Sequence, residues 1–188
     1  KNFRKKISPD YKGHRNRKKP CGYKRVIRNL KIEYDVCIMP ELEADDAMGI
    51  YATKVTGNII VSPDKDMRQI PGKLYNLEDT TTITPEEGAK WHLIQTLAGD
   101  QTDGYSGVPG IGVKRAETLF NKEGYSWATV VKAFEDKGLT EEDALLNARL
   151  ARILTVEDYD SKRKEPKLWT PEASYTINDG TGLQDASD

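Results

Sequence analysis

Residues that build disulfide, zinc and histidine-dependent sites are scarce in this 188-residue sequence. There are two cysteines, Cys21 and Cys37, and two histidines, His14 and His92, and their spacing matches neither a disulfide framework nor a zinc motif. Two isolated histidines also leave no recognisable Ser-His-Asp arrangement. No run approaches the roughly 18 apolar residues of a membrane span, and no apolar segment follows the basic start as in a secretory signal. We therefore expect an intracellular, cytoplasmic protein.

Positive charge is concentrated at one end of the chain. The net charge is −1, but residues 1–31 contain thirteen lysines and arginines and one acid, whereas the remaining residues contain sixteen lysines and arginines and twenty-nine acids. A basic arm on an acidic body is typical of proteins that bind polyanions. Charge alone leaves open the alternative of a solvated charged face.

Hydrophobic periodicity and turn residues predict an α/β fold. Short β-branched runs alternate with longer helical segments, which is typical of a mostly parallel sheet covered by helices. We expect strands over Tyr34–Met39, Asn58–Ser62 (buried), Lys73–Leu77 and Thr80–Ile83. We expect helices from Pro20 onward and over Glu41–Val55, Thr84–Ala98, Val113–Phe120, Ser126–Asp136 and Thr140–Leu154, with a helical turn at Lys65–Gln69.

Seven carboxylates fall into three groups that open helices or follow predicted elements. They are Glu43, Asp45 and Asp46; Asp64 and Asp66; and Asp100 and Asp103. In an open α/β sheet ligands bind outside the carboxyl ends of the strands, where the first two groups are expected. Their repulsion favours Mg²⁺ or Mn²⁺, and two such ions could activate a water for phosphodiester hydrolysis. The alternative is that these acids only cap helices and complement helix dipoles.

A glycine-rich stretch, Gly107–Ala116, is the sharpest local motif. It is not a P-loop, because Val113 separates Gly112 from Lys114, and no strand feeds it as a dinucleotide fingerprint requires. We expect a tight turn between helices whose backbone N–H groups, with Lys114 and Arg115, can bind phosphate. An ordinary helix-hairpin connection is the alternative.

Four motifs that occur in order resemble a known family. They are E-A-D-D at Glu43–Asp46, S-P-D-K-D at Ser62–Asp66, G-D-Q-T-D-G at Gly99–Gly104 and G-V-P-G-I-G-V-K-R-A at Gly107–Ala116. Together they resemble the 5′-nuclease family of flap endonucleases, the 5′-nuclease domain of bacterial DNA polymerase I and phage 5′–3′ exonucleases. Podovirus-type phage exonucleases are especially similar through D-G-Y-S-G at Asp103–Gly107, W-H-L at Trp91–Leu93, A-R-I-L at Ala151–Leu154 and L-W-T-P at Leu168–Pro171.

The resemblance implies a PIN-like core that holds two Mg²⁺ or Mn²⁺ ions. The first ion would be served, directly or through water, by Glu43, Asp45, Asp46 and Asp64, and the second by Asp66, Asp100 and Asp103. Phe3–Arg15 resembles the arch side of the family, so Tyr11, Lys12 and Arg15 would lie near the gateway for the 5′ strand and the scissile phosphate, with Arg4 and Lys5 as further DNA contacts. A helix-two-turn-helix would grip duplex DNA through Gly107, Gly110, Gly112, Lys114 and Arg115, around a possible K⁺ held by main-chain carbonyls of residues 107–114.

The same resemblance divides the chain into four parts. They are a basic arch or gateway segment with a helix (1–32), an α/β metal-binding core (33–98), a helical DNA-binding subdomain (99–157) and a C-terminal extension (158–188), of which we expect 171–188 to be mobile. Family members begin with an aspartate-bearing strand, and a second strand ends in another aspartate just before the F-R segment, whereas Lys1 follows both. A fragment, a core completed by a separate N-terminal chain, and a degenerate gene product all stay open.

These features predict a metal-dependent 5′–3′ exonuclease that hydrolyses DNA near 5′ ends during phage replication or recombination, in the cytoplasm of an infected bacterium. The expected partner is double-stranded DNA with a 5′ end or flap, with an RNA–DNA hybrid as a further candidate. Two alternatives stay beside this hypothesis: a non-catalytic, structure-specific duplex-binding module, and a fragment that is active only with a separate N-terminal chain.

Overall fold

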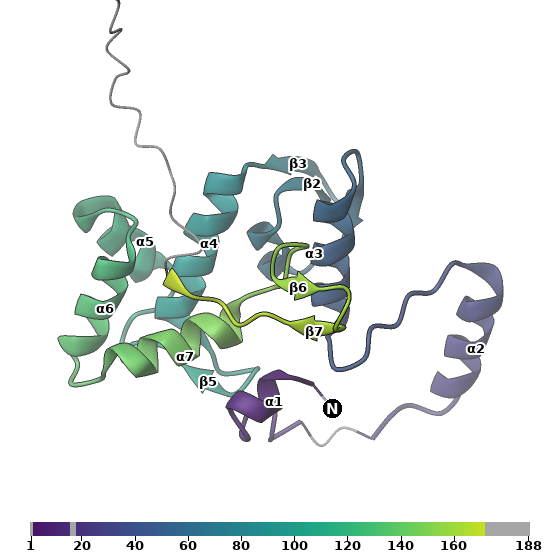
Figure 1. Cartoon of the computed structure of the whole chain (residues 1–188), viewed down its shortest axis with the longest axis horizontal. Helices are drawn as coiled ribbons and strands as arrows, with labels where there is room; N and C mark the ends of the chain where they lie inside the picture. Colours follow the sequence, from purple (N-terminus) through teal and green to yellow (C-terminus); the bar gives the residue numbers. More distant parts are fainter. Residues whose placement is uncertain (1, 16–17, 172–188) are drawn as a thin grey trace, which may run out of the picture.

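The computed structural model describes residues 2–15 and 18–171 (Figure 1). The main elements are α1 (Arg4–Ile7), α2 (Tyr23–Glu33), α3 (Ala44–Lys54), β1 (Ile59–Val61), the 3₁₀ turn η1 (Lys65–Gln69), β2 (Gly72–Tyr75), β3 (Thr80–Ile83), α4 (Pro85–Ala98), α5 (Val113–Glu123), α6 (Trp127–Glu135) and α7 (Glu141–Ala151). Two small hairpins are formed by β4 (Gly99–Asp100) with β5 (Tyr105–Ser106) and by β6 (Tyr159–Asp160) with β7 (Glu165–Pro166). The α/β class is confirmed.

The main sheet has the order β1-β2-β3. β1 pairs with β2 in parallel, with Ile60 opposite Leu74, and β2 pairs with β3 antiparallel. Ile60 and Leu74 are buried in one cluster with Met67, Ile70 and Ile153, which join η1 and the segment after α7 to the sheet. The predicted parallel arrangement is thus confirmed for one of the two strand pairs.

Local capping explains why α4, α6 and α7 begin where the sequence predicts. The Thr84 hydroxyl accepts from the Glu87 N–H at 3.1 Å, and the Glu87 carboxylate accepts from the Thr84 N–H at 2.8 Å. Thr140 and Asp143 form the same box at α7, and Ser126 caps α6. These bonds satisfy N–H groups that have no partner within a helix.

Helix α4 connects the sheet to the helical part of the chain. Its buried Leu93 and Leu97 pack in one cluster with Phe120 of α5 and with Val130 and Phe134 of α6. Figure 1 shows α4 between these helices and the elements around the sheet. The boundary predicted between residues 98 and 99 therefore passes beside a shared core, and the four-part division stays a prediction.

Two strand predictions need correction. Tyr34–Met39 forms no strand, because no neighbouring strand pairs with it in the described part of the chain, and Tyr34, Val36 and Ile38 are exposed. The predicted strand Asn58–Ser62 exists as β1, at the edge of the sheet, but it is buried on one face alone. Ile60 is buried, whereas Ile59 and Val61, on the opposite face, are 53% and 58% exposed.

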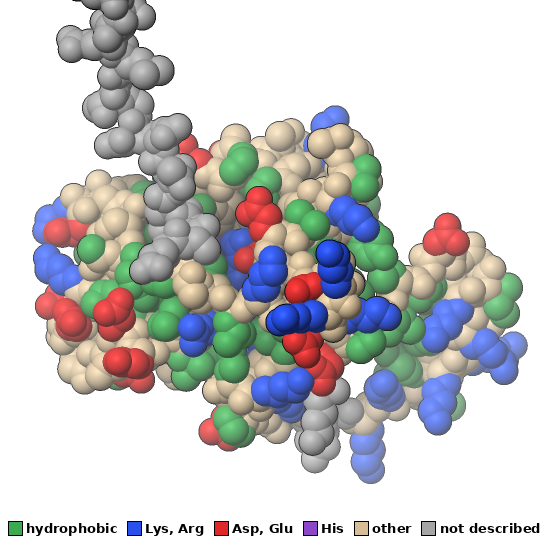
Figure 2. Space-filling view, in the orientation of Figure 1, with side chains coloured by type: hydrophobic (Ala, Val, Ile, Leu, Met, Phe, Trp, Pro, Cys, Tyr) green, Lys and Arg blue, Asp and Glu red, His purple; other side chains and the backbone are tan. Residues whose placement is uncertain are grey.

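Helix α2 stands apart from the rest of the molecule (Figure 1). All of its residues are exposed, including an apolar stripe of Tyr23, Val26, Ile27 and Leu30, and Figure 2 shows lysine and arginine side chains across it. None of the described helices is long and apolar enough to cross a membrane. Residues 172–188, which hold nearly all of the segment predicted to be mobile, lie outside the described residues.

Candidate functional site

The three acidic groups come from different elements and lie within electrostatic reach of one another. Asp45 lies in the first turn of α3, and Asp66 lies in the first turn of η1, where its N–H donates to Asp64 Oδ1 at 3.0 Å. Asp100 ends β4, and its carboxylate accepts from the backbone N–H groups of Thr102 and Asp103, which shapes the turn. Acids are favoured at helix starts because they complement the helix dipole, so local structure helps to gather them.

Burial and mutual repulsion perturb two of these carboxylates. Burial raises the pKa of Asp66 to about 6, with a further contribution from Asp64 that the nearby Lys65 partly opposes. The pKa of Asp45 is raised by burial and then by the charges of Asp64 and Glu43. A positive charge placed between these groups would relieve that repulsion.

Two cations from residues 11–15 reach the same acids. Lys12 Nζ lies 2.7 Å from Glu43 Oε2 and 3.3 Å from Asp103 Oδ2, and Arg15 Nη2 lies 2.7 Å from Asp103 Oδ1. The side chains of Lys12, Glu43 and Asp103 are only 17–20% exposed, whereas that of Arg15 is 41% exposed. The cations predicted for the scissile region therefore lie beside the predicted metal ligands.

Tyr11 anchors this segment beneath the acids. Its ring is 1% exposed, and its hydroxyl is 3.0 Å from Asp103 Oδ2 and 3.2 Å from Glu43 Oε2. Burial raises the pKa of Tyr11. The charge of Arg4 opposes the increase, whereas the charges of Glu43 and Asp103 add to it. The hydroxyl therefore stays protonated and can donate to either carboxylate.

Backbone contacts lock the 11–15 segment onto the β4–β5 loop. The Lys12 N–H donates to the Asp103 carbonyl at 2.7 Å, and Arg15 Nε donates to the Thr102 carbonyl at 3.1 Å. Gly104 has φ +82°, and a Cβ there would lie 3.0 Å from the Asp10 carbonyl oxygen and 3.2 Å from Lys12 N, so glycine permits the close approach.

The structure places Arg4 and Asp46 inside the protein, and we correct both assignments. They form a two-pronged ion pair with distances of 2.7 and 2.8 Å, and they are 2% and 0% exposed. Asp46 also accepts from the N–H groups of Glu43 and Leu154, so its oxygens hold the fold together. Although burial alone would lower the pKa of Arg4, its hydrogen bonds and the charge of Asp46 raise it. Arg4 is not presented to DNA, and Asp46 is not open to an ion.

Two glutamines that no sequence motif marked lie behind the acidic groups. Gln95 of α4 donates to Asp66 Oδ1 at 2.6 Å, and the buried Gln69 donates to Gln95 Oε1 at 2.6 Å. The sequence does hold a signal for Gln95, because it stands between the inward-facing Ile94 and Leu97 of α4. A polar side chain buried there needs hydrogen-bond partners.

The glycine-rich loop connects β5 to α5. A Cβ at Gly107 would lie 2.1 Å from the Leu97 carbonyl oxygen, so close packing requires glycine at this position, and its DNA contact stays a prediction. Gly110 has φ +81°, its carbonyl accepts from Arg115 Nη1 at 2.6 Å, and Gly112 is the N-cap of α5 with open space around it.

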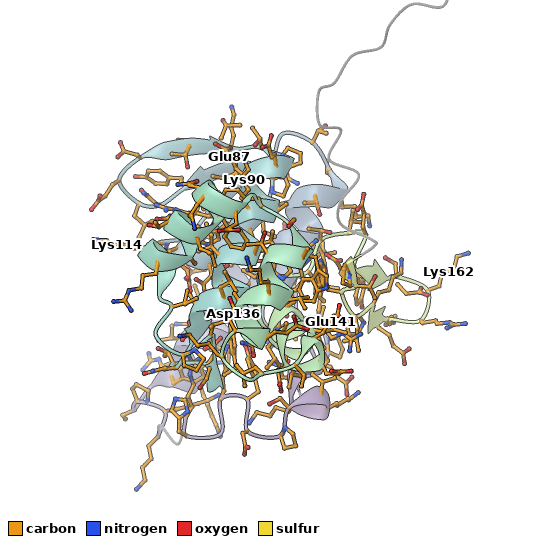
Figure 3. The ribbon with its side chains drawn as sticks, turned by 90° about the vertical axis from the view of Figure 1, so that its left-hand side faces the viewer. Glu87, Lys90, Lys114, Asp136, Glu141 and Lys162 are labelled. Carbon is orange, nitrogen blue, oxygen red and sulfur yellow. The ribbon has the colours of Figure 1, made fainter. Side chains whose placement is uncertain are left out.

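Lys5, Lys114 and Arg115 are the exposed cations among the predicted DNA contacts outside the acidic site. Figure 3 shows Lys114 projecting away from the first turn of α5 into solvent. Its neighbour Arg115 is exposed but engaged by the loop through Gly110. This end of α5 thus combines a free helix N-terminus with positive charge, which suits a phosphate.

Divalent cations suit the donor chemistry of this site. Its donors are carboxylate oxygens, and Mg²⁺ and Mn²⁺ prefer such ligands. Within residues 2–15 and 18–171, however, no three His, Cys, Asp or Glu side chains are grouped closely enough to hold a metal ion. Lys12 and Arg15 instead neutralise part of the acidic charge.

Comparisons with known proteins agree on one family. The chain is 33% identical to the exodeoxyribonuclease of Enterobacteria phage T3, over 90% of this chain and 70% of that protein, and 32% identical to the exonuclease of Escherichia phage T7, over 90% and 71%. It is 30% identical to a 5′-3′ exonuclease of Mycobacterium tuberculosis, over 84% and 62%. A scan against protein-family models found no match.

Solved structures show the same fold. The phage T5 5′-exonuclease with bound divalent zinc ions superposes with a TM-score of 0.61 at 18% identity, covering 80% of this chain and 70% of that one. A phage T5 flap endonuclease in complex with DNA and metal ions gives a TM-score of 0.60 at 18% identity, covering 79% and 69%. By sequence similarity over most of its length, and with a fold that agrees, the chain belongs to the 5′-nuclease family of phage and bacterial 5′–3′ exonucleases.

Proposed function

We propose that the chain is a metal-dependent 5′–3′ exonuclease that hydrolyses DNA phosphodiesters near 5′ ends. The observation that carries this proposal is the convergence of acids from α3, η1 and the β4–β5 loop beside Lys12 and Arg15. The relatives named exodeoxyribonuclease and 5′-3′ exonuclease support the same reaction. Because two of these relatives are phage proteins, we further propose a role in phage replication or recombination in the host cytoplasm.

The acids that would hold divalent cations are those that the fold leaves open. They are Asp45, Asp64, Asp66 and Asp100, together with Glu43 and Asp103 when Lys12 and Arg15 release them. When bound, Mg²⁺ or Mn²⁺ supplies an activated water and stabilises charge on the phosphate. Burial, and after it the charges of neighbouring acids, raises the pKa of Asp45 and of Asp66, and a bound cation would offset both effects.

Lys12 and Arg15 would exchange carboxylates for the phosphate of the 5′ strand. Both cations lie at the acidic site, and the Lys12 backbone is held by Asp103, so the ammonium group stays nearby when it changes partner. A positioned cation stabilises the negative charge that develops on phosphate during hydrolysis. Tyr11 would keep the segment in place through its buried ring.

The duplex would be held at the start of α5, away from the reacting phosphate. Gly110, Gly112, Lys114 and Arg115 would contact the backbone there, with Lys5 as a further contact from α1. Such contacts give affinity without reading sequence. A K⁺ bound by main-chain carbonyls of 107–114 would have to share the Gly110 oxygen with Arg115. The DNA complex of the phage T5 relative supports a DNA substrate, and we extend this to 5′ flaps and RNA–DNA hybrids.

A fragment that needs a further N-terminal chain is the second candidate. The edge position of β1, the exposure of Ile59 and Val61 and the unpaired segment 34–39 favour it, since a parallel sheet is normally buried on both faces. A non-catalytic duplex-binding module is the third candidate, and the absence of three grouped ligands within the described residues favours it.

The test measures nucleotide release from a 5′-labelled duplex with Mg²⁺ and with EDTA. The parent chain is compared with Asp64→Ala and with Glu135→Ala, an exposed acid on α6 remote from the site. Release that requires both Mg²⁺ and Asp64 but not Glu135 supports the exonuclease. Duplex binding without release by the parent would reject catalysis by this chain alone and favour the second or third candidate.

A further inference from the structure

Gln69 has an amide whose orientation the backbone dictates. It is 2% exposed, its Oε1 accepts from the Ile153 N–H at 3.0 Å, and its Nε2 donates to the Ala151 carbonyl at 2.7 Å. A backbone N–H can only donate and a carbonyl can only accept, so turning the amide would place like groups together at both contacts. The end of α7 therefore sets which way Gln69 faces.

The orientation of Gln69 in turn determines that of Gln95. The second N–H of Gln69 donates to Gln95 Oε1 at 2.6 Å, which leaves Nε2 of Gln95 as the group that faces Asp66 Oδ1, at 2.6 Å. Gln95 is 8% exposed, so water offers its amide little alternative. α4 consequently presents a donor, not an acceptor, to the carboxylate.

This donor acts on one oxygen of Asp66. The hydrogen bond engages Oδ1, and among the hydrogen bonds of the described residues none engages Oδ2. One oxygen is thus tied to α4, through Gln95 and Gln69, and to the end of α7, while the other is available to the acidic site. Partners of this kind orient a metal ligand, and their loss typically costs metal affinity.

We propose that Gln95 is a positioning residue, held in its donating orientation by Gln69, that turns Asp66 so that its second oxygen faces a divalent cation. This inference rests on the proposed function, because Asp66 must be a ligand for its orientation to matter. Neither glutamine touches substrate or the reacting atoms. Their effect reaches the reaction only through Asp66.

The experiment measures Mn²⁺ binding directly, by the loss of the free-ion electron paramagnetic resonance signal, for the full chain without DNA. The variants are Gln95→Met, which keeps the side-chain length but removes the donor, and Gln69→Met, which leaves Gln95 free to turn. The control is Asn147→Leu, which removes another buried amide, one that donates to the Ser106 carbonyl at 2.6 Å and has no hydrogen bond to a carboxylate. Thermal unfolding and metal-free duplex binding are measured for each variant.

Gln95→Met should weaken Mn²⁺ binding about 10-fold, and Gln69→Met should weaken it in the same direction by less. Asn147→Leu should lower the melting temperature while leaving Mn²⁺ affinity within about twofold of the parent, because its lost bonds only stabilise the fold. Should Gln95→Met fail to fold, the Mn²⁺ affinity of Gln69→Met, a substitution in η1 and not in α4, tests the same proposal.

Two results would overturn the proposal, and they are distinguishable. Mn²⁺ binding by the parent with unchanged affinity in both glutamine variants would reject the positioning role and leave the proposed function intact. No Mn²⁺ binding by the folded parent would reject the metal site itself, and the positioning role with it. A loss of Mn²⁺ affinity in Asn147→Leu equal to that in Gln95→Met would also reject a specific role.

Discussion

The two basic parts of the chain, residues 3–15 and α2, have similar composition and opposite surroundings. In residues 3–15 the cations meet carboxylates: Arg4 pairs with Asp46, and Lys12 pairs with Glu43. In α2 every residue is exposed, and none of the ion pairs among the described residues involves this helix. The same residue types therefore support the fold in one segment and are available to a polyanion in the other. Burial and partners, not charge, separate these roles.

The cations of residues 3–15 range from fully buried to exposed. Arg4 is buried and fully engaged, Lys12 is mostly buried at the site, and Arg15 lies at its exposed rim. A buried pair is costly to break because the remaining charge has no solvent, whereas an exposed cation can exchange one anion for another. Side-chain exposure thus increases from Arg4 through Lys12 to Arg15, toward the side from which a DNA phosphate would enter.

The largest expected effect is on stability, from Arg4→Met. Removal of the guanidinium leaves Asp46 buried without a counter-charge, so the free energy of unfolding should fall by about 4 kcal/mol, as measured by urea denaturation. Lys6→Met breaks the exposed Lys6–Glu41 pair and should change it far less, because water screens that pair. Equal losses in the two variants would contradict the contrast between buried and exposed cations.

His92 is buried without a charged hydrogen-bond partner, and its titration tests the same contrast between buried and exposed groups. Burial lowers the pKa of His92 to about 3, the charge of Arg152 adds to this, and its ring bonds the Ala148 carbonyl at 2.9 Å. Because the unfolded chain binds this proton near pH 6.5 and the folded chain does not, stability should fall as pH falls from about 6.5 to about 3, by about 5 kcal/mol in total. His92→Gln should lose this part of the pH dependence of urea denaturation, whereas the exposed His14→Gln should keep it.

Lys12→Ala tests the cation at the acidic site. We expect the rate of cleavage at saturating DNA to fall about 10²-fold, because a positioned positive charge at the phosphate is lost. Duplex binding should stay within about threefold of the parent, since most backbone contacts remain. Lys6→Ala serves as the control in the same assay. A variant that binds DNA poorly but cleaves bound DNA at the parental rate would move Lys12 from catalysis to binding.

The smallest expected effect comes from α2. A double variant, Arg25→Gln with Arg28→Gln, should reduce the slope of log affinity against log salt by up to about 2, because each lost phosphate contact removes about 0.9. The free energy of unfolding should not change, since both side chains are exposed. Lys162→Gln with Arg163→Gln, on the β6–β7 turn, is the charge-matched control. Equal slopes for the two double variants would remove α2 from the DNA-binding surface.

Elements with local stop and start signals were predictable from the sequence. α4 and α7 begin at Thr84 and Thr140 because side chains within four residues satisfy the first N–H groups. The strand predicted over Tyr34–Met39 had the right composition but no neighbour to pair with, so its pattern was not sufficient. A helix closes its hydrogen bonds within itself, whereas a strand depends on a partner elsewhere in the chain.

In the candidate site, too, features set by neighbouring residues were predictable, and contacts between distant residues were not. Short motifs marked the acids around Asp45, Asp64 and Asp100 and the loop before Lys114, because the residue types that suit cations and phosphates are visible in any sequence. The same motifs could not show that Asp46 belongs to Arg4, which lies 42 positions away, or that Gln95 faces Asp66. Those assignments depend on desolvation and on distances that close only when the chain folds.

By itself, the sequence determined the α/β class, the family, the main helices and the set of candidate acids and bases, since periodicity, caps and motifs act over a few residues. The tertiary structure alone decided which cation is buried with a carboxylate, which cation stays exchangeable at the site, and which amide orients Asp66. The reason is physical: a charge or an amide takes its role from its burial and its partners, and both are set by residues distant in the chain.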